Sequence, residues 1–235
     1  KSAELRSEFR RYNKDYEKYQ KELRKRQYKK YGAQYFANDR MALNTSIMTM
    51  SVNMNNAFME QIKNGDEHVQ EVLHFINLNN ESINTNAPND KYDGKTPLIY
   101  AITNSSPLIA RVLIAVGADV NAPTKYGNTP LMYAALKGYT EIVQELLNIN
   151  KEFGKYQADV NATNSNGNTA LMYATRDGNT EIVQALIAAG ADVNAPTKYG
   201  NTPLMYATRD GNTEIAQALI AKGADVNAKN DKTGW

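Results

Sequence analysis

The chain has 235 residues, 42% of them hydrophobic, so it can bury a sizeable core. It contains no cysteine, which excludes disulfide scaffolds, thiolate metal clusters and cysteine nucleophiles. The formal net charge of +2 is unevenly distributed: residues 1–40 carry 13 Lys or Arg against 6 Asp or Glu, and the other 195 residues carry 14 against 19. No apolar run approaches the roughly 20 residues that a membrane-spanning helix needs.

Residues 1–40 are expected to form a basic, tyrosine-rich helix followed by a linker. Residues 1–31 contain neither Gly nor Pro, and one stripe of apolar and aromatic side chains recurs at helical spacing: Leu5, Phe9, Tyr12, Tyr16, Tyr19 and Leu23. We expect this stripe to pack on the rest of the protein while the basic residues face solvent. Two alternatives are binding of nucleic acid and binding of an anionic membrane surface.

Residues 41–90 form a second segment that begins rich in methionine. It holds five of the eight methionines of the chain: Met41, Met48, Met50, Met54 and Met59. The flexible thioether fills irregular gaps, so these side chains are expected to pack within the protein and not to bind a metal.

Residues 91–235 contain an internal sequence repeat. The runs GNTPLMYAALKGYTEIVQELL, GNTALMYATRDGNTEIVQALI and GNTPLMYATRDGNTEIAQALI recur along the chain. A glycine marks each unit: Gly94, Gly127, Gly167, Gly200 and Gly234. The longest interval, from Gly127 to Gly167, contains an insertion around residues 149–156.

Each unit is expected to contain two short helices. Thr129-Pro130 places a capping hydroxyl before a proline that suits the first helical position. Gly138 is expected to end this helix, and Thr140 to cap the next one. The second helix carries an apolar face, including Ile142 and Leu146, which only neighbouring units can bury.

The run G-N-T-P-L-M-Y-A-A-x-x-G-x-T-E-I-V-x-x-L-L-x-x-G-A-D-V-N-A resembles the ankyrin repeat, over roughly residues 91–229 as four units. The resemblance implies an all-α solenoid of helix-turn-helix units with projecting loops. One departure is systematic, because the histidine of the family's TPLH is replaced by Ile99, Met132, Met172 and Met205.

The two ends of the array are expected to differ. Residues 57–84 resemble a degraded unit and are interpreted as an N-terminal capping repeat, with a more polar outer face. At the other end, Thr233-Gly234-Trp235 begins a fifth unit, and the chain starts with Lys1. We therefore expect the sequence to be a fragment of a longer polypeptide.

No catalytic constellation is evident in the sequence. His68 and His74 are six residues apart, so they would point to different faces of a helix. Acidic residues such as Asp119 recur at one place in every unit, which is typical of structural residues. We expect a protein that is not an enzyme, binds no cofactor or metal, and has no small-molecule substrate.

The resemblance implies that a protein partner is bound by the loop tips and by the exposed ends of the first helices. The residues that match these positions are Tyr92, Lys95, Lys125, Tyr126, Asn128, Lys137, Asn166, Asn168, Arg176, Asp177, Lys198, Tyr199, Asn201, Arg209 and Asp210. Tyr126 and Tyr199 are the expected anchors, and the alternative is that both pack on adjacent loops. Four tyrosines at one helix position are expected to pack between repeats: Tyr100, Tyr133, Tyr173 and Tyr206.

Three asparagines match the pattern L-x5-D-V-N, which resembles the substrates of an asparaginyl hydroxylase of animal cells. They are Asn121, Asn194 and Asn227. A further copy of the pattern, between those of Asn121 and Asn194, is interrupted, because Phe153 stands eight residues before Asn161. Hydroxylation is therefore expected only if the protein works inside such a cell.

The leading hypothesis is a non-catalytic module for protein–protein interaction, located in the cytoplasm. One alternative is the recognition arm of a larger protein, such as an effector that a bacterium secretes into the cytosol of a host cell. Another is binding of nucleic acid or anionic membranes by residues 1–31.

Overall fold

The computed structural model describes residues 86–148 and 157–230, together with eight single positions between 56 and 72. The chain divides into two compact units, residues 1–84 and 85–235. In the first unit the described side chains of Met59, Ile62 and Val72 are buried. The predicted helix over 1–31, most of the predicted capping repeat, the 149–156 insertion and residues 231–235 lie outside the described residues.

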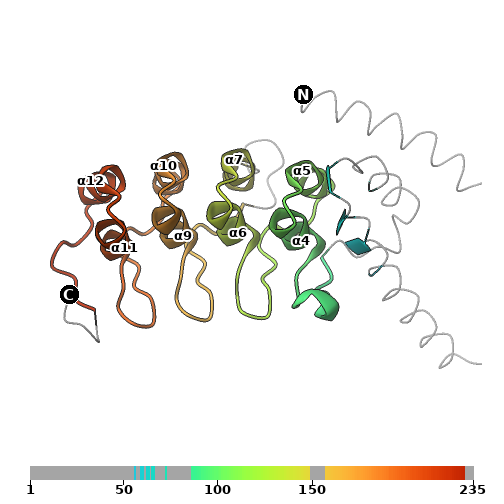
Figure 1. The fold of residues 1–235 in the computed structure, drawn as a ribbon, viewed down its shortest axis with the longest axis horizontal. Helices are drawn as coiled ribbons and strands as arrows, with labels where there is room; N and C mark the ends of the chain where they lie inside the picture. Colours follow the sequence, from blue (N-terminus) through green and yellow to red (C-terminus); the bar gives the residue numbers. More distant parts are fainter. Residues whose placement is uncertain are drawn as a thin grey trace, which may run out of the picture. The chain divides into compact units, whose positions relative to one another are not determined.

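The second unit is built from four helix pairs. They are α4 (Pro97–Thr103) with α5 (Pro107–Ala115), α6 (Pro130–Leu136) with α7 (Thr140–Asn148), α9 (Ala170–Asp177) with α10 (Thr180–Ala188), and α11 (Pro203–Arg209) with α12 (Thr213–Ala221). A short 3-10 helix, η2 (Asp90–Tyr92), precedes the first pair. Figure 1 shows α4, α6, α9 and α11 in one row and α5, α7, α10 and α12 in a second row. The predicted all-α solenoid is therefore confirmed.

Every first helix begins at a capping threonine. The hydroxyls of Thr96, Thr129, Thr169 and Thr202 each accept a hydrogen bond from the backbone N–H three residues later. That later residue is the one that replaces the family's histidine, and Ile99, Met132 and Met172 bury their side chains almost completely. Buried apolar side chains thus occupy the position that histidine has in the family pattern.

The predicted caps of the second helices were wrong by one residue. Thr140, Thr180 and Thr213 are the first helical residues. Asn179 caps α10 by accepting a hydrogen bond from the N–H of Ile182 at 3.0 Å. Asn212 precedes α12, but its side-chain amide donates to the carbonyl of Thr175 in the preceding repeat at 2.8 Å.

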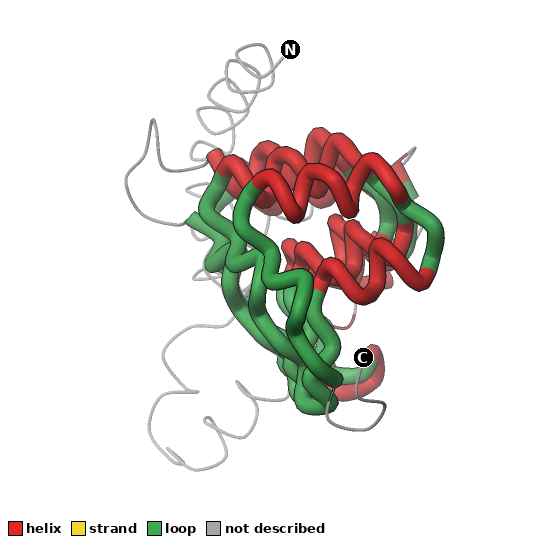
Figure 2. Tube along the Cα trace, turned by 90° about the vertical axis from the view of Figure 1, so that its left-hand side faces the viewer, coloured by secondary structure: helices red, strands yellow, loops and turns green. Residues whose placement is uncertain are grey.

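The loops between successive pairs project beyond the two helix layers on one side (Figure 2). Neighbouring loops are joined through their backbones: the carbonyl of Tyr126 accepts from the N–H of Ser165 at 2.9 Å, and the carbonyl of Asn166 accepts from Lys198 at 3.0 Å. The loop tips consequently form a continuous edge along the array.

The core lies between the two helix rows and between successive pairs. Its largest fully buried side chains in the array are Leu98, Ile99, Ile102, Ile109, Leu113, Leu131, Met132, Ile142 and Leu146. Ile142 and Leu146 belong to the apolar face predicted for the second helix, and α7 contacts both α5 and α10. Burial of that face by neighbouring repeats is confirmed.

Candidate partner-binding surface

The candidate surface combines the loop tips, residues 90–95, 125–128, 165–168 and 198–201, with the ends of the first helices, residues 103–104, 136–137, 176–177 and 209–210. We call it the loop–helix surface. Ten of the predicted contact residues are exposed on it: Lys125, Tyr126, Lys137, Asn166, Arg176, Asp177, Lys198, Tyr199, Arg209 and Asp210. Five are half-buried: Tyr92, Lys95, Asn128, Asn168 and Asn201.

Tyr126 and Tyr199 are exposed large hydrophobic residues of the loop tips. Their exposed fractions are 55% and 49%. The backbone carbonyl of Tyr126 accepts bonds from both the N–H and the hydroxyl of Ser165, so the next loop fixes its main chain. A rigid loop therefore presents a ring with about half of its area open to solvent.

Lys125 links the first two loops. Its Nζ lies 3.4 Å from Oδ1 of Asp93 and 5.0 Å from the ring centroid of Tyr126. Hydrogen bonding with Tyr126 and then with Asp93 raises the pKa of Lys125. The ammonium group thus lies between the carboxylate of Asp93 and the exposed ring of Tyr126.

Tyr92 is placed differently from the other two tip tyrosines. Its ring centroid is 4.5 Å from that of Tyr100, at an interplanar angle of 50°, and Nζ of Lys91 lies 5.2 Å from its centroid. Tyr92 therefore packs on the first helix of its own repeat.

Asparagines join the bases of the loops. The Asn164 amide donates to Oδ1 of Asn128 at 2.7 Å and to the hydroxyl of Tyr173 at 3.0 Å. Burial raises the pKa of Tyr173, and the hydrogen bond with Asn164 opposes that shift. Asn201 accepts an equivalent bond from the amide of Asn230. Asn128 and Asn201, two predicted contact residues, thus hold neighbouring repeats together.

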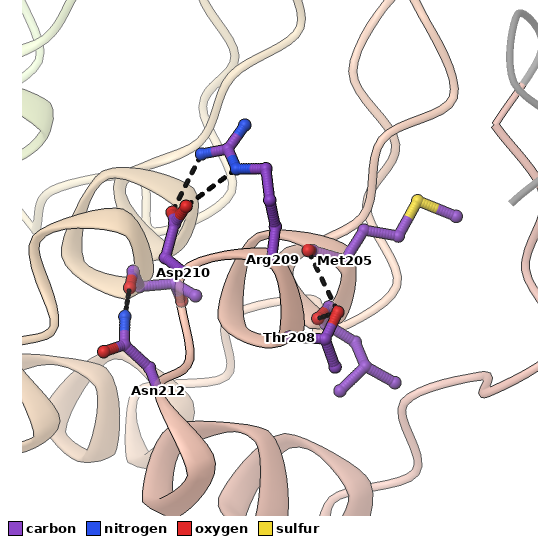
Figure 3. Close-up of polar contacts among 7 residues, drawn as sticks. Met205, Thr208, Arg209, Asp210 and Asn212 are labelled. Atoms are coloured by element: carbon purple, nitrogen blue, oxygen red, sulfur yellow. Dashed lines mark hydrogen bonds and ion pairs between the residues drawn. The ribbon is translucent and has the colours of Figure 1, made fainter.

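A cluster of charged and aromatic groups lies at the ends of α9 and α11. The guanidinium carbons of Arg176 and Arg209 are 5.5 and 5.0 Å from the ring centroid of Tyr206. Arg209 also donates from Nε and Nη2 to the two carboxylate oxygens of Asp210, at 2.7 and 2.8 Å (Figure 3). The bonds from Arg209 lower the pKa of Asp210, and the charges of Arg209 and Arg176 act in the same direction.

A second set of asparagines bridges the repeats away from this surface. Asn194 accepts from the N–H of Asp225 at 2.8 Å and donates to the carbonyl of Gly223 at 2.9 Å. Asn121 makes the same two bonds to residues of the next repeat, and so does Asn161. We call Asn121, Asn161 and Asn194 the bridging asparagines.

Sequence reasoning missed this bridging role, although Asp-Val-Asn recurs at one place in every unit. Two of the three candidate hydroxylation residues, Asn121 and Asn194, are bridging asparagines, and so is Asn161 of the interrupted pattern. Asn227 stands at the matching place after the last helix pair, and its side chain makes no onward bond within residues 86–148 and 157–230.

Two features are absent from the described residues, a metal-binding cluster and a membrane-spanning helix. No group of three His, Cys, Asp or Glu side chains there could hold a metal ion. Among the helices that the structure describes, none is both long and apolar enough to cross a membrane.

The sequence matches a family model whose repeats are consistent with the helix pairs described above. Residues 58–155 and 150–230 match the family model for ankyrin repeats (3 copies), which is more than half of the chain. The chain belongs to the ankyrin repeat family. Ankyrin repeats are in general protein–protein interaction modules and not catalysts.

Two curated relatives match shorter stretches of this ankyrin repeat chain. One is the "Putative E3 ubiquitin-protein ligase XBAT35" of Arabidopsis thaliana, 44% identical over 59 residues, which are 24% of this chain. The other is a "Putative ankyrin repeat protein" of Rickettsia bellii (strain RML369-C), 34% identical over 96 residues, which are 40% of this chain. In both comparisons the match spans 13% of the relative's own length.

Proposed function

We propose that the loop–helix surface binds a protein partner, with Tyr126 and Tyr199 as aromatic anchors. The support is that each ring is about half exposed while the loop that carries it is bonded through its backbone to a neighbouring loop. Little conformational entropy is lost when a rigid aromatic side chain binds. This combination of open ring and fixed main chain is the observation on which the proposal rests.

The experiment is a fourfold alanine variant at Tyr126, Tyr199, Arg176 and Arg209. A partner is first isolated on the wild-type chain, purified and titrated, and its Kd is expected to weaken by about 100-fold or more in the variant, because truncating an interface anchor costs about 2 kcal/mol or more. Helical circular dichroism should be unchanged, since all four side chains lie on the exposed surface.

The matched control places four alanines on the exposed side of the second helices, at Glu181, Gln184, Glu214 and Gln217. The partner should bind this control as tightly as the wild type. A partner that binds the fourfold loop–helix variant with undiminished affinity would refute the proposal.

We further propose that these repeats are the recognition part of a longer protein, such as a secreted bacterial effector. The match to the Rickettsia bellii protein, of which it covers 13%, favours this context. Sequencing the parent gene tests it: a reading frame that starts near Lys1 and ends near Trp235 would contradict it.

Two other hypotheses stay predictions. Residues 1–31, for which binding of nucleic acid or anionic membranes is an alternative to packing on the rest of the protein, lie outside the described residues. Hydroxylation of Asn121 or Asn194 would require the enzyme to reach a side chain that bridges two repeats.

A further inference from the structure

Charge is distributed unevenly between the loop–helix surface and the rest of the array. Among the described residues from 86 onward, the loop–helix surface carries seven basic and four acidic side chains, a net charge of +3. The remaining described residues of the array carry three basic and eight acidic side chains, a net charge of −5. A partner with negative charge is therefore attracted to the loop–helix surface and repelled by the rest of the array.

Two guanidinium groups concentrate this positive charge. Arg176 and Arg209 both lie within 5.5 Å of the Tyr206 ring centroid, so one buried aromatic side chain supports both. A guanidinium over an aromatic face is held in place while its N–H groups remain available. Within the described part of the chain no carboxylate lies at salt-bridge distance from Arg176.

The Arg209–Asp210 pair shows that the arginine cluster at the ends of α9 and α11 binds a carboxylate. Its carboxylate takes two charge-assisted hydrogen bonds from Arg209, in the paired geometry that matches a guanidinium to a carboxylate. The same pair of residues occurs one repeat earlier as Arg176-Asp177, and both arginines lie near the Tyr206 ring, but within the described part of the chain Arg176 forms no ion pair with Asp177. Arg176 is left as a preorganised donor beside an arginine that already binds a carboxylate.

We infer that the partner is recognised through an acidic segment, one carboxylate of which binds Arg176 beside the Tyr206 ring, next to the Arg209–Asp210 pair. The inference rests on the proposed function, because it specifies the chemistry of the partner at the same surface. An acidic peptide fits better than a nucleic acid: Asp93, Asp177 and Asp210 interrupt the basic residues, and a continuous phosphate backbone would meet each of them.

The test uses a library of random 12-residue peptides displayed on phage and selected on the full chain. The recovered peptides are expected to be rich in Asp and Glu. A synthetic copy of the most enriched peptide should then lose about tenfold or more in affinity for Arg176→Ala, since a hydrogen-bonded charge pair is worth about 1.5–3 kcal/mol.

Asp210→Asn provides a variant that should gain affinity. It removes the competing charge and releases Arg209, so the acidic peptide should bind about fivefold more tightly, as expected for about 1 kcal/mol between charges near 4 Å in water. A purely structural role of Arg209 would not produce this gain. Lys222→Ala, which removes one exposed positive charge outside the loop–helix surface, is the matched control and should leave the affinity unchanged.

The possible failures are distinguishable. Peptides that lose binding with alanine at Tyr126 and Tyr199 but lack acidic residues, or bind Arg176→Ala normally, would overturn the inference and leave the proposed function standing. Peptides insensitive to all these variants, or no recovered peptide at all, would overturn both. Displacement of the acidic peptide by a 12-nucleotide oligouridylate of equal affinity would reveal unselective attraction of polyanions, and would also overturn the inference.

Discussion

At the scale of single residues, asparagine side chains join successive repeats through hydrogen bonds. Each bridging asparagine accepts a hydrogen bond from one backbone N–H and donates one to a backbone carbonyl of the next repeat, as Asn194 does to Asp225 and Gly223. Both partners are main-chain groups, so the bridge depends little on the side chains of the next repeat. The recurrence of asparagine after Asp-Val in successive repeats thus has a structural cause.

Asn194→Ala is expected to lower the free energy of unfolding by about 1–2 kcal/mol, because two hydrogen bonds of about 1 kcal/mol net are lost. Asn227→Ala is the matched control: it removes the same residue from the same motif, where no onward bridge exists among the described residues, and should change stability by less than about 0.5 kcal/mol. Urea denaturation of the full chain measures both. Equal effects of the two substitutions would argue against the bridging role.

The candidate site shows where residue-level prediction from sequence ends. Exposure of Tyr126, Tyr199 and the arginines follows from the repeat pattern, because tips and helix ends face outward in every unit. The sequence offers no reason for Arg209 to pair with Asp210 while Arg176, also followed by an aspartate, forms no such pair in the described part of the chain. The side-chain conformation of each arginine depends on contacts with the neighbouring repeat, and the sequence pattern of a single repeat carries no information about those contacts.

At the scale of the elements, helix starts were predictable to within one residue. Thr129-Pro130 and Thr202-Pro203 gave the right first residues, since the capping hydroxyl and the proline agree. The second helices α7, α10 and α12 begin within Gly-Tyr-Thr or Gly-Asn-Thr, and both Asn and Thr can cap a helix. The backbone dihedral angles determine whether the Asn or the Thr is the capping residue, and the local sequence does not predict these angles.

Glycine is required in the array for two separate reasons, which a substitution in a loop tip (Gly167) and one after the end of α10 (Gly190) separate. Gly167 has φ of +78°, and a Cβ there would lie 2.8 Å from the backbone nitrogen of Lys198 in the next loop. Gly190 has φ of +91°, but a Cβ there would meet nothing within 4 Å. Only Gly167 is therefore needed for close approach as well as for its backbone conformation.

Gly190→Ala is expected to cost about 1–2 kcal/mol, the penalty of a left-handed conformation for alanine. Gly167→Ala should cost clearly more, at least about 3 kcal/mol, because the loops must also separate. The midpoints of thermal unfolding of the two variants compare these costs directly. A Gly167→Ala variant as stable as Gly190→Ala would mean that the loops are not held in contact.

At the scale of the whole array, identical sequences acquire different environments from their position. The run LMYATRDGNTEI occurs in α9–α10 and again in α11–α12. Met172 is fully buried between neighbouring helix pairs, whereas Met205, its counterpart, is only half-buried. Burial is thus a property of the stack, and a single repeat taken alone does not predict it.

Met172→Ala is expected to lower the free energy of unfolding by about 2–5 kcal/mol, as for other large-to-small changes in a core. Met205→Ala should cost less than half as much, because its side chain already contacts solvent. Urea denaturation of the full chain, with each variant compared with wild type, gives the two values. A reversed order would contradict the difference in burial.

The bridging asparagines have a consequence for how such a chain can diversify. Because each bridging asparagine bonds to main-chain atoms of the next repeat, most outward side chains of that repeat can change without disturbing the bridge. New ligand preferences can therefore arise by exchanging exposed residues such as Tyr126, Lys198 and Tyr199, or by inserting a copy of a whole repeat, while Asn128 and Asn201 must stay because their side chains also join repeats.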